Sequence, residues 1–240
     1  MFGCRWMIDI HSHILPGVDD GAQTLDESLE MLAVAVSQGI TTQILTPHIQ
    51  PGRFNNTKAD LLKHFAKFEA VVKKEGLPIE LKLAAEVRIG PEVMQLVSNN
   101  DIPWLTTASG KNVFLLEFPR QDVPFGSDNL VKWLLANNCT PIIVHPERNR
   151  TFVDNPKKLQ PFIDLGCPFQ ITASSLTGKF GDDVQKMAHS LLNDGTAKYV
   201  ASDCHNLKGR KPDLGEVLST LPDNITKNVL HSTHSLIYGH

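Results

Sequence analysis

The stretch that decides the fold is Met7-Ile8-Asp9-Ile10-His11-Ser12-His13, which leads into Asp19-Asp20-Gly21. Its apolar start predicts a short strand, and the Pro16-Gly17 and Asp20-Gly21 pairs predict a loop after it. Because side chains alternate along an extended backbone, His11 and His13 should point the same way and reach one ion. One His-x-His pair is weak evidence, since surface and core histidines also produce it. Its meaning depends on whether the rest of the chain repeats the placement.

Downstream of this strand, predicted helices and strands alternate. Thr24 and Glu27 form a capping box for a helix that ends at Gly39, and Thr57 caps a second helix that ends at Gly76. Further helices are predicted from Pro91 and at 130–136, 156–165 and 184–192, and further strands at 41–45, 79–85, 113–116, 141–144, 168–171 and 198–201. Seven strands alternating with helices predict an α/β fold with parallel pairing, because a parallel neighbour needs a crossover.

The residues at the carboxyl ends of these strands are unusual. A potential metal ligand stands at every predicted strand end except the sixth: His11 and His13, His48, Glu86, Glu117, His145, Asp203 and His205. In a closed or nearly closed parallel barrel these ends converge on one face. Polar strand ends alone would favour Lys, Asn and Ser as often as His and Glu, yet five of the ten histidines fall here. We therefore predict a metal cluster.

Length and composition limit the remaining classes of protein. A chain of 240 residues that is 41% hydrophobic and 20% charged fits one barrel-sized domain or two small ones. A formal net charge of -3 without a Lys/Arg cluster argues against a nucleic-acid partner. Four cysteines without paired spacing, no signal-peptide core and no apolar run of about 18 residues favour a cytoplasmic protein without membrane insertion. Residues 1–6 read as an amino-terminal extension, so translation starts at Met1 or Met7.

The predicted donor set indicates the chemistry. Five histidines and at least three carboxylates exceed the four ligands of a structural zinc site and suit two or three ions of manganese, iron or zinc. Such a site is typical of hydrolysis, because bridging ions activate water and bind both the attacking and the leaving oxygen. Arg148 and Arg210 follow predicted ligands closely in sequence and offer the bidentate donors that phosphate favours. Each arginine alone is more typical of a surface residue, but the two arginines together favour a phosphate ester as the substrate.

These motifs resemble those of a known family. They are Asp9-Ile10-His11-Ser12-His13, Val18-Asp19-Asp20-Gly21, Thr46-Pro47-His48, Ala85-Glu86, Leu116-Glu117-Phe118, His145-Pro146-Glu147-Arg148 and Ser202-Asp203-Cys204-His205-Asn206-Leu207-x-Gly209-Arg210. The chain resembles the bacterial metal-dependent protein-tyrosine phosphatases of the polymerase-and-histidinol-phosphatase (PHP) superfamily, the type associated with capsule and exopolysaccharide control. The resemblance covers almost the whole chain up to about Leu221. It implies a distorted seven-stranded, TIM-like α/β barrel, as a single domain over 7–240, that holds three divalent ions, usually manganese.

The resemblance also implies a role for each matching residue. The first ion would be held by His11, His13, Glu86 and Asp203, the second by Glu86, Glu117 and His145, and the third by Asp20, His48 and His205. Arg148 and Arg210 would bind the phosphate, so with the bridging Glu86 they are the predicted catalytic residues. The implied substrate is a phosphotyrosine protein, typically the tail of a tyrosine autokinase of polysaccharide export. The expected reaction is direct in-line attack by a metal-bound hydroxide.

Three alternatives remain open at this point. Another phosphoesterase on the same scaffold, such as a histidinol-phosphate phosphatase or a polymerase-associated nuclease, would keep most of the ligands, although the lack of a basic surface argues against the nuclease. A non-catalytic metal-binding regulator would leave the arginines unexplained. Five residues separate Cys204 from Arg210, as in tyrosine phosphatases with a cysteine nucleophile, but one glycine between them is few for a phosphate-binding loop.

Overall fold

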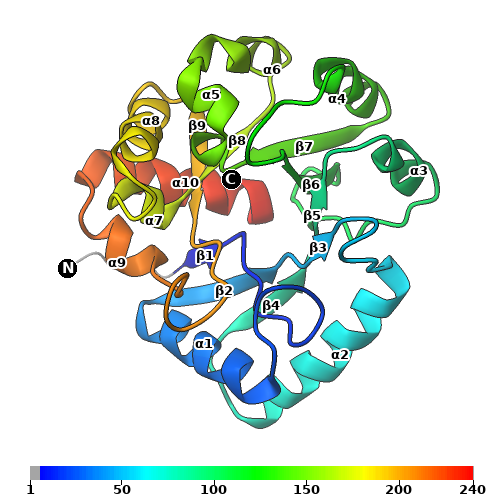
Figure 1. The fold of residues 1–240 in the computed structure, drawn as a ribbon. Coiled ribbons are helices and arrows are strands. Elements are labelled where there is room, and N and C mark those ends of the chain that lie inside the picture. The colour runs from blue at the N-terminus through cyan, green and yellow to red at the C-terminus, as the bar shows by residue number, and fades with distance from the viewer. Residues whose placement is uncertain (1–5, 240) are drawn as a thin grey trace.

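The strands of the protein form two parallel sheets in a computed structural model that describes residues 6–239 (Figure 1). Residues 1–5 of the predicted extension lie outside the described residues. The first sheet has the order β1 (Met7–Asp9), β2 (Ile40–Leu45), β4 (Glu80–Leu83). The second has the order β3 (His48–Ile49), β5 (Glu86–Arg88), β6 (Asn112–Glu117), β7 (Cys139–Val144), β8 (Phe169–Thr172), β9 (Ala197–Ala201). The predicted α/β fold with parallel pairing is confirmed.

The predicted seven-stranded barrel is not confirmed, because the strands are divided between sheets of three and six. Two interruptions account for part of this difference. Pro47 lies between β2 and β3 and has no N–H to donate to a ladder. The second interruption follows β4, which ends before Glu86. Glu86 begins a new strand, β5, which pairs with β3 and β6. An isolated parallel bridge from Ser12 to Cys204 connects the segments that follow β1 and β9.

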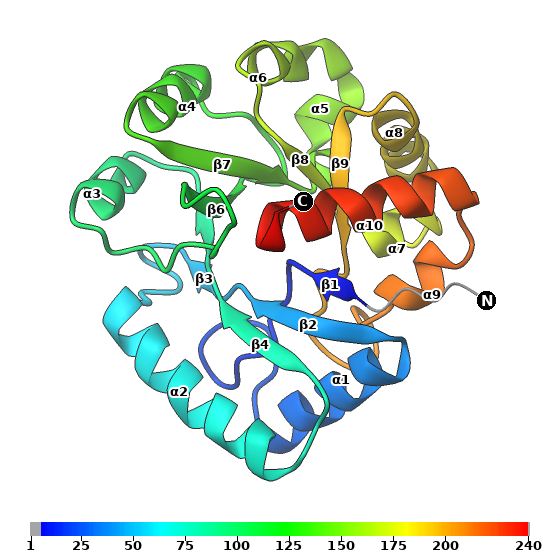
Figure 2. The same cartoon turned by 180° about the vertical axis from the view of Figure 1, so that it is seen from behind.

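Helices surround the two sheets and are seen around the ring of strands in Figures 1 and 2. They are α1 (Leu25–Ser37), α2 (Lys58–Lys74), α3 (Glu92–Ser98), α4 (Ser127–Ala136), α5 (Arg150–Asp154), α6 (Gln160–Asp164), α7 (Ala173–Leu176), α8 (Asp182–Asn193), α9 (Leu214–Leu218) and α10 (Asp223–Tyr238), with 3-10 turns at Pro146–Arg148 and Pro156–Leu159. The predicted amino-terminal caps form: the Thr24 and Thr57 side chains accept hydrogen bonds from the backbone N–H groups of Glu27 and Asp60. No helix in the described part of the chain is long and apolar enough to cross a membrane.

Alternate strand residues pack into two different apolar clusters. In β6, Phe114 and Leu116 join the cluster that contains most of the buried helix residues, while Val113 and Leu115 join a second cluster. This second cluster, the inner core, consists of Ile8, Ile10, Ile44, Ala84, Leu105, Val113, Leu115, Ile142, Val144, Tyr199, Ala201 and Ile237. It fills the space between the sheets, so the strand ends above it have a rigid base.

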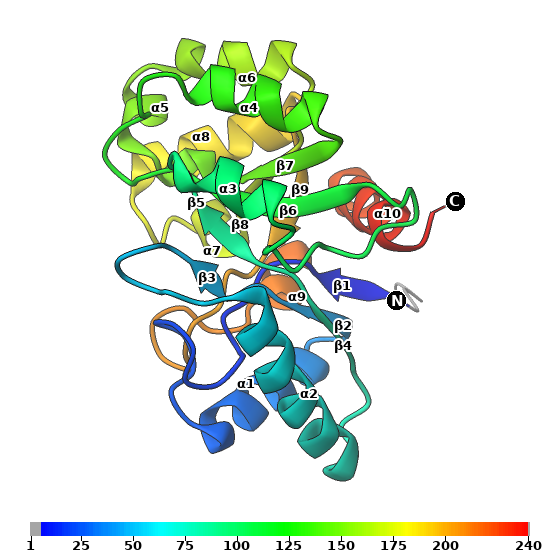
Figure 3. The same cartoon turned by 90° about the vertical axis from the view of Figure 1, so that its right-hand side faces the viewer.

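The carboxyl tail, which the family motifs do not reach, forms α10 at one end of the strands (Figures 2 and 3). Ile237 is 5% exposed and belongs to the inner core. The Tyr238 hydroxyl hydrogen-bonds with Thr42 and donates to Glu80, near the amino ends of β2 and β4. The helix therefore closes the amino-terminal end of the strands and leaves their carboxyl ends for the site.

Truncation of Ile237 tests this closing role. We expect Ile237→Ala to lower the free energy of unfolding by about 2–4 kcal/mol, because it opens a cavity in the inner core. The matched control is Ile163→Ala on α6, where the side chain is 36% exposed and the loss should be about 1 kcal/mol or less. Urea denaturation followed by circular dichroism measures both. Equal losses in the two variants would contradict the packing of α10 into the inner core.

Candidate metal centre

Four side chains from three separate segments meet in a buried group beyond the inner core. His11 Nε2 lies 3.3 Å from His13 Nε2, 3.3 Å from Glu86 Oε2 and 3.3 Å from Asp203 Oδ1. His13 Nε2 lies 3.2 Å from the same Glu86 oxygen and 3.5 Å from the same Asp203 oxygen. Ligand atoms about 2.1 Å from one ion at tetrahedral angles lie about 3.4 Å apart. The four atoms therefore have the spacing of a shared ion.

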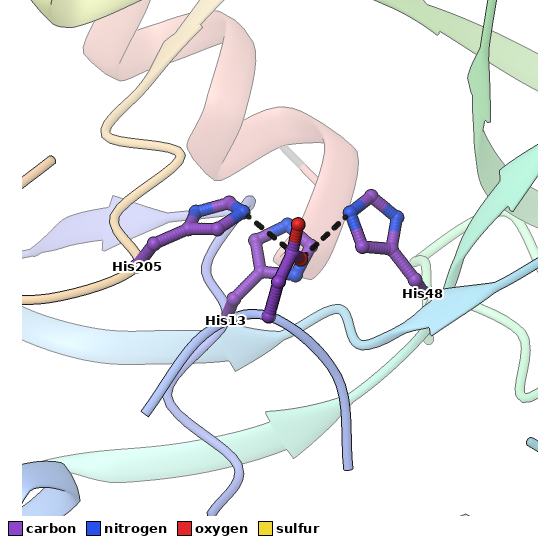
Figure 4. A group of neighbouring side chains, drawn as sticks. His13, His48 and His205 are labelled. Carbon is purple, nitrogen blue, oxygen red and sulfur yellow. Dashed lines mark ion pairs between the residues drawn. The ribbon is translucent and has the colours of Figure 1, made fainter. Parts of the chain in front are cut away.

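A second group adjoins the first through His13. Its members are His13, Asp20, His48 and His205, with ligand atoms within 4.8 Å of one another. Asp20 Oδ1 lies 3.4 Å from His48 Nε2 and 3.6 Å from His205 Nε2. Figure 4 shows the His48 and His205 rings approaching this carboxylate from opposite sides, with His13 between them. The structure thus brings together Asp20, His48 and His205, the three residues predicted for the third ion.

The residues predicted for the second ion lie on the other side of Glu86. His145 Nε2 is 2.8 Å from Glu86 Oε1, and Glu117 groups with Glu86 and His48. His48 Nδ1 lies 3.0 Å from Glu86 Oε2 and 3.7 Å from Glu117 Oε2. His145 itself groups with His11 and Asp203. Every predicted ligand is therefore in the cluster, while its division among individual ions stays a prediction.

Buried side-chain atoms without a hydrogen-bond partner indicate that this group of side chains fits a cation. Asp203 Oδ1, Glu117 Oε2 and His48 Nδ1 are buried and have no hydrogen-bond partner among the described residues. Buried polar atoms are normally hydrogen-bonded, since an unpaired one costs about 1–3 kcal/mol. All three atoms belong to predicted ligands and face other predicted ligands. Divalent cations coordinated by these nitrogen and oxygen atoms would satisfy them.

The protonation states of the histidines follow from burial and neighbouring charge. Burial, followed by the Arg148 charge, lowers the pKa of His145 to about 4. Burial and the neighbouring His13 lower the pKa of His205 to about 2, so both rings are neutral at pH 7. Burial also lowers the pKa of His11, but the carboxylates of Asp203 and Glu86 outweigh it and the net shift is upward. Metal binding would release any such proton, because a ligating imidazole is neutral.

Glu117 differs from the other carboxylates of the cluster. Burial, with the charge of Glu86 as the next cause, raises the pKa of Glu117 to about 7. Burial also raises the pKa of Glu86, but His11 and His48 outweigh it, so the net pKa lies well below its usual range. Burial and a neighbouring carboxylate therefore make an ionised Glu117 costly at this position, and a bound divalent cation would offset that cost.

Two further side chains orient the histidine pair, and sequence reasoning assigned neither a role. Asp19 Oδ2 accepts a hydrogen bond from His13 Nδ1 at 2.7 Å, and Gln170 Oε1 lies 2.7 Å from His11 Nδ1. These contacts leave Nε2 of each ring facing the centre. Asp19 stands in the quoted loop motif, and Gln170 lies on β8, the strand predicted to carry no ligand. The available signal for Gln170 was a polar residue between the apolar residues Phe169 and Ile171.

The loop that carries Asp19 packs against the backbone of His13. Ala22 N donates to His13 O at 2.9 Å, and Gly21 N donates to Asp19 Oδ1 at 2.9 Å. A Cβ at Gly21 would lie 1.9 Å from His13 O, so only glycine permits this approach. The Asp-Asp-Gly motif thus combines an orienting carboxylate, a predicted ligand and the glycine that lets the loop close.

Two predicted ligands also have uncommon backbone conformations. His145 has φ 37° and Asp203 has φ 52°, in the left-handed region that non-glycine residues rarely adopt. His145 directly follows β7 and Asp203 lies two residues after β9, and the turn at each residue directs its side chain into the cluster. Such conformations persist where surrounding structure enforces them, commonly at functional sites.

Arg148 and Arg210 border the same group. Both guanidinium groups form ion pairs with Asp203 Oδ2, while Asp203 Oδ1 faces His11 and His13. Arg210 Nη1 also lies 2.9 Å from His205 Nε2. The two predicted phosphate-binding residues therefore lie at the edge of the candidate metal centre.

Cys204 is placed unfavourably for a nucleophile. Its side chain is fully buried, and burial, with the charge of Asp9 as the next cause, raises the pKa of the thiol well above its ordinary value. In the following loop, the amides of Lys208, Gly209 and Arg210 donate to Asn206 Oδ1 and are thus used internally. This geometry argues against the cysteine mechanism.

Comparison with known proteins agrees with this geometry. The profile of a family described as capsular polysaccharide synthesis, CpsB/CapC, matches residues 7–234. The chain is 36% identical over 230 residues to the tyrosine-protein phosphatase YwqE of Bacillus subtilis, covering 92% of this chain and 89% of that protein. It is 34% identical over 206 residues to the putative tyrosine-protein phosphatase CapC of Staphylococcus aureus, covering 85% of this chain and 79% of the other.

Comparison with solved structures also finds a similar metal-dependent tyrosine phosphatase. Crystal structures of YwqE from Bacillus subtilis and CpsB from Streptococcus pneumoniae, described as unique metal-dependent tyrosine phosphatases, include a chain that matches with a TM-score of 0.88 and 33% identity. The match covers 98% of this chain and 95% of that one. A phosphotriesterase homology protein from Escherichia coli matches with a TM-score of 0.59 at 15% identity, which shows a similar fold only.

Replacement of the orienting carboxylate tests the construction of the centre. We expect Asp19→Asn to weaken manganese binding by about 10–100-fold, because the His13 ring loses its carboxylate partner. Calorimetric titration of metal-stripped protein measures the affinity. Asp194→Asn is the matched control, because exposed Asp194 makes the same contact to a backbone N–H two residues on, at Thr196. Unchanged affinity in Asp19→Asn would contradict the orienting role.

Proposed function

The chain belongs to the CpsB/CapC family of capsular polysaccharide synthesis, and we propose that it is a metal-dependent tyrosine-protein phosphatase. The observation that carries this proposal is the buried group of His11, His13, Glu86 and Asp203 with two arginines at its edge. Ligands for cations and donors for a phosphoryl group stand side by side there. A phosphate ester is a substrate class that uses both, and the tyrosine phosphatases among the relatives favour a monoester.

We assign the cations to the ligand sets that the family resemblance implies. His11, His13, Glu86 and Asp203 would hold one ion. Glu86, Glu117 and His145 would hold a second, and Asp20, His48 and His205 a third. The mixed nitrogen and oxygen donors suit manganese, with iron and zinc as the alternatives. When bound, two or three such ions would lower the pKa of a water molecule and offset charge on the phosphoryl oxygens.

Asp203 connects the two parts of the proposed site. One of its carboxylate oxygens faces the histidine pair, and the other contacts Arg148 and Arg210. The arginines are thereby positioned to donate to equatorial phosphoryl oxygens next to the cations. The side chains of Arg148 and Arg210 are 21% and 27% exposed, so their remaining N–H groups are accessible from solvent. Tyrosinate, with a solution pKa of about 10, is a tolerable leaving group for direct attack by water.

The proposed substrate is a phosphotyrosine side chain of a protein. The family description refers to capsular polysaccharide synthesis. We therefore propose that the substrate protein is a tyrosine autokinase of capsule or exopolysaccharide synthesis, phosphorylated in its tail. That reaction takes place in the cytoplasm, which is the proposed location. Comparison of a phosphotyrosine peptide with histidinol phosphate and single-stranded DNA identifies the preferred substrate. Preference for either of the latter would overturn the assignment.

Glu86→Gln tests the role of the shared carboxylate. The substitution keeps the shape of the side chain but removes the charge that two cations would share, so we expect hydrolysis of a phosphotyrosine peptide to fall by at least about three orders of magnitude. The assay uses metal-stripped protein with manganese, iron, zinc or magnesium added back separately. Cys204→Ser is the control and should retain near wild-type turnover.

Circular dichroism spectra must show that Glu86→Gln is folded. Near wild-type turnover in a folded Glu86→Gln variant would refute the bridging role. Activity that resists chelators but is lost in Cys204→Ser would reverse the choice of mechanism.

A further inference from the structure

A positively charged cavity adjoins the candidate metal centre. Its volume is about 210 Å³, and it reaches Glu117 and His145 on one side. The charged residues that line it are Arg53, Arg88, Arg120, Arg148 and Glu117. Four guanidinium groups thus face one carboxylate. Of these arginines, the family resemblance gives a role only to Arg148.

Most of this positive charge is neutralised only by groups of the proposed metal centre. Arg88 Nε lies 3.1 Å from Glu117 Oε2, and Arg53 Nη2 lies 3.3 Å from Asp20 Oδ2. Both carboxylates are proposed metal ligands, so bound cations would offset the same negative charge. Arg120 is exposed and forms no ion pair with any residue that the structure describes. The cavity therefore has an excess of positive charge.

The loop that presents Arg120 is held in place. Arg150 N donates to Arg120 O at 2.8 Å, and Asn149 Nδ2 donates to the carbonyl oxygens of Pro119 and Asp122 at 2.6 and 2.8 Å. Asn149 directly follows Arg148, so the loop is fixed against the segment that carries a proposed phosphate-binding residue. The backbone at Arg120 is thus fixed before any substrate arrives, which lowers the entropic cost of ordering this loop on binding.

We propose that this cavity is a specificity subsite, which binds a second anionic group of the same substrate chain, close to the phosphotyrosine. The inference rests on the proposed function, since it places a substrate peptide at the metal centre. Guanidinium groups bind carboxylates and phosphoryl groups in the same bidentate manner. The anion is therefore an acidic side chain or a second phosphorylated tyrosine. Arg120 and Arg88 are the specificity residues, and neither takes part in the chemical step.

Three peptides that share one phosphotyrosine test the subsite. The first has acidic residues beside the phosphotyrosine, the second has their amides, and the third has a second phosphotyrosine. We expect wild-type protein to hydrolyse the first or third with kcat/KM about tenfold above the second, because charged hydrogen bonds to the subsite form only there. A larger gain for the third peptide assigns the subsite to a phosphoryl group, and a larger gain for the first assigns it to a carboxylate.

Charge reversal at Arg120 isolates the cavity. Arg120→Glu should abolish the preference and leave hydrolysis of free phosphotyrosine within about twofold of wild type, since Arg120 lies outside the proposed catalytic group. Arg150→Glu is the matched control, because exposed Arg150 lies next to the same loop but outside the cavity. It should keep the preference. Measurements at about 0.15 M salt limit effects of distant charge.

The outcomes separate this inference from the proposed function. If the wild-type protein hydrolyses free phosphotyrosine normally but shows no preference among the three peptides, the subsite alone is overturned. An equal loss of preference in Arg120→Glu and Arg150→Glu would also overturn it, because the effect would then be general electrostatics. Wild-type protein that hydrolyses no phosphotyrosine compound with any added metal would overturn the proposed function, and the subsite with it.

Discussion

The structure depends on burying the carboxylates of Glu86 and Asp203 against the rings of His11 and His13. Each of these four side chains is at most 1% exposed, although ionised groups are costly to remove from water unless they are paired. The histidines offset part of this cost, and Asp203 gains two arginines. Bound cations would supply the compensation that remains, and the unsatisfied oxygen of Asp203 is consistent with this role. The rest of the fold serves to hold these charges together: the inner core supports them, and α10 closes the opposite end.

Much of this arrangement is predictable from sequence, for a simple reason. In parallel strands that alternate with helices, the carboxyl ends lie on one side, so residues far apart in sequence can be placed together without tertiary information. His11, Glu117 and His145 were predicted on this basis, and the structure brings them into one cluster. The capping threonines were predictable because their hydrogen bonds are local.

Other features could not be predicted, because they depend on contacts that the strand pattern does not encode. The division into two sheets follows from where β2 and β4 end, and the apolar residues Ala84 and Ala85 continue through the second break without a change of pattern. Gln170 contacts His11 across a sequence separation of 159 residues, so its role appears only in the folded chain. The quoted sequence motifs also end before the tail, yet an apolar side chain near the end of the tail belongs to the inner core. The family resemblance concerns the site and says little about the closing helix.

We expect the atoms His11 Nε2, His13 Nε2, Glu86 Oε2 and Asp203 Oδ1 to share one cation. Anomalous diffraction at the manganese edge, from crystals grown with manganese, locates such ions directly. We predict an anomalous peak about 2.0–2.3 Å from each of these four atoms. Manganese peaks only at other positions, in protein that hydrolyses phosphotyrosine, would contradict it.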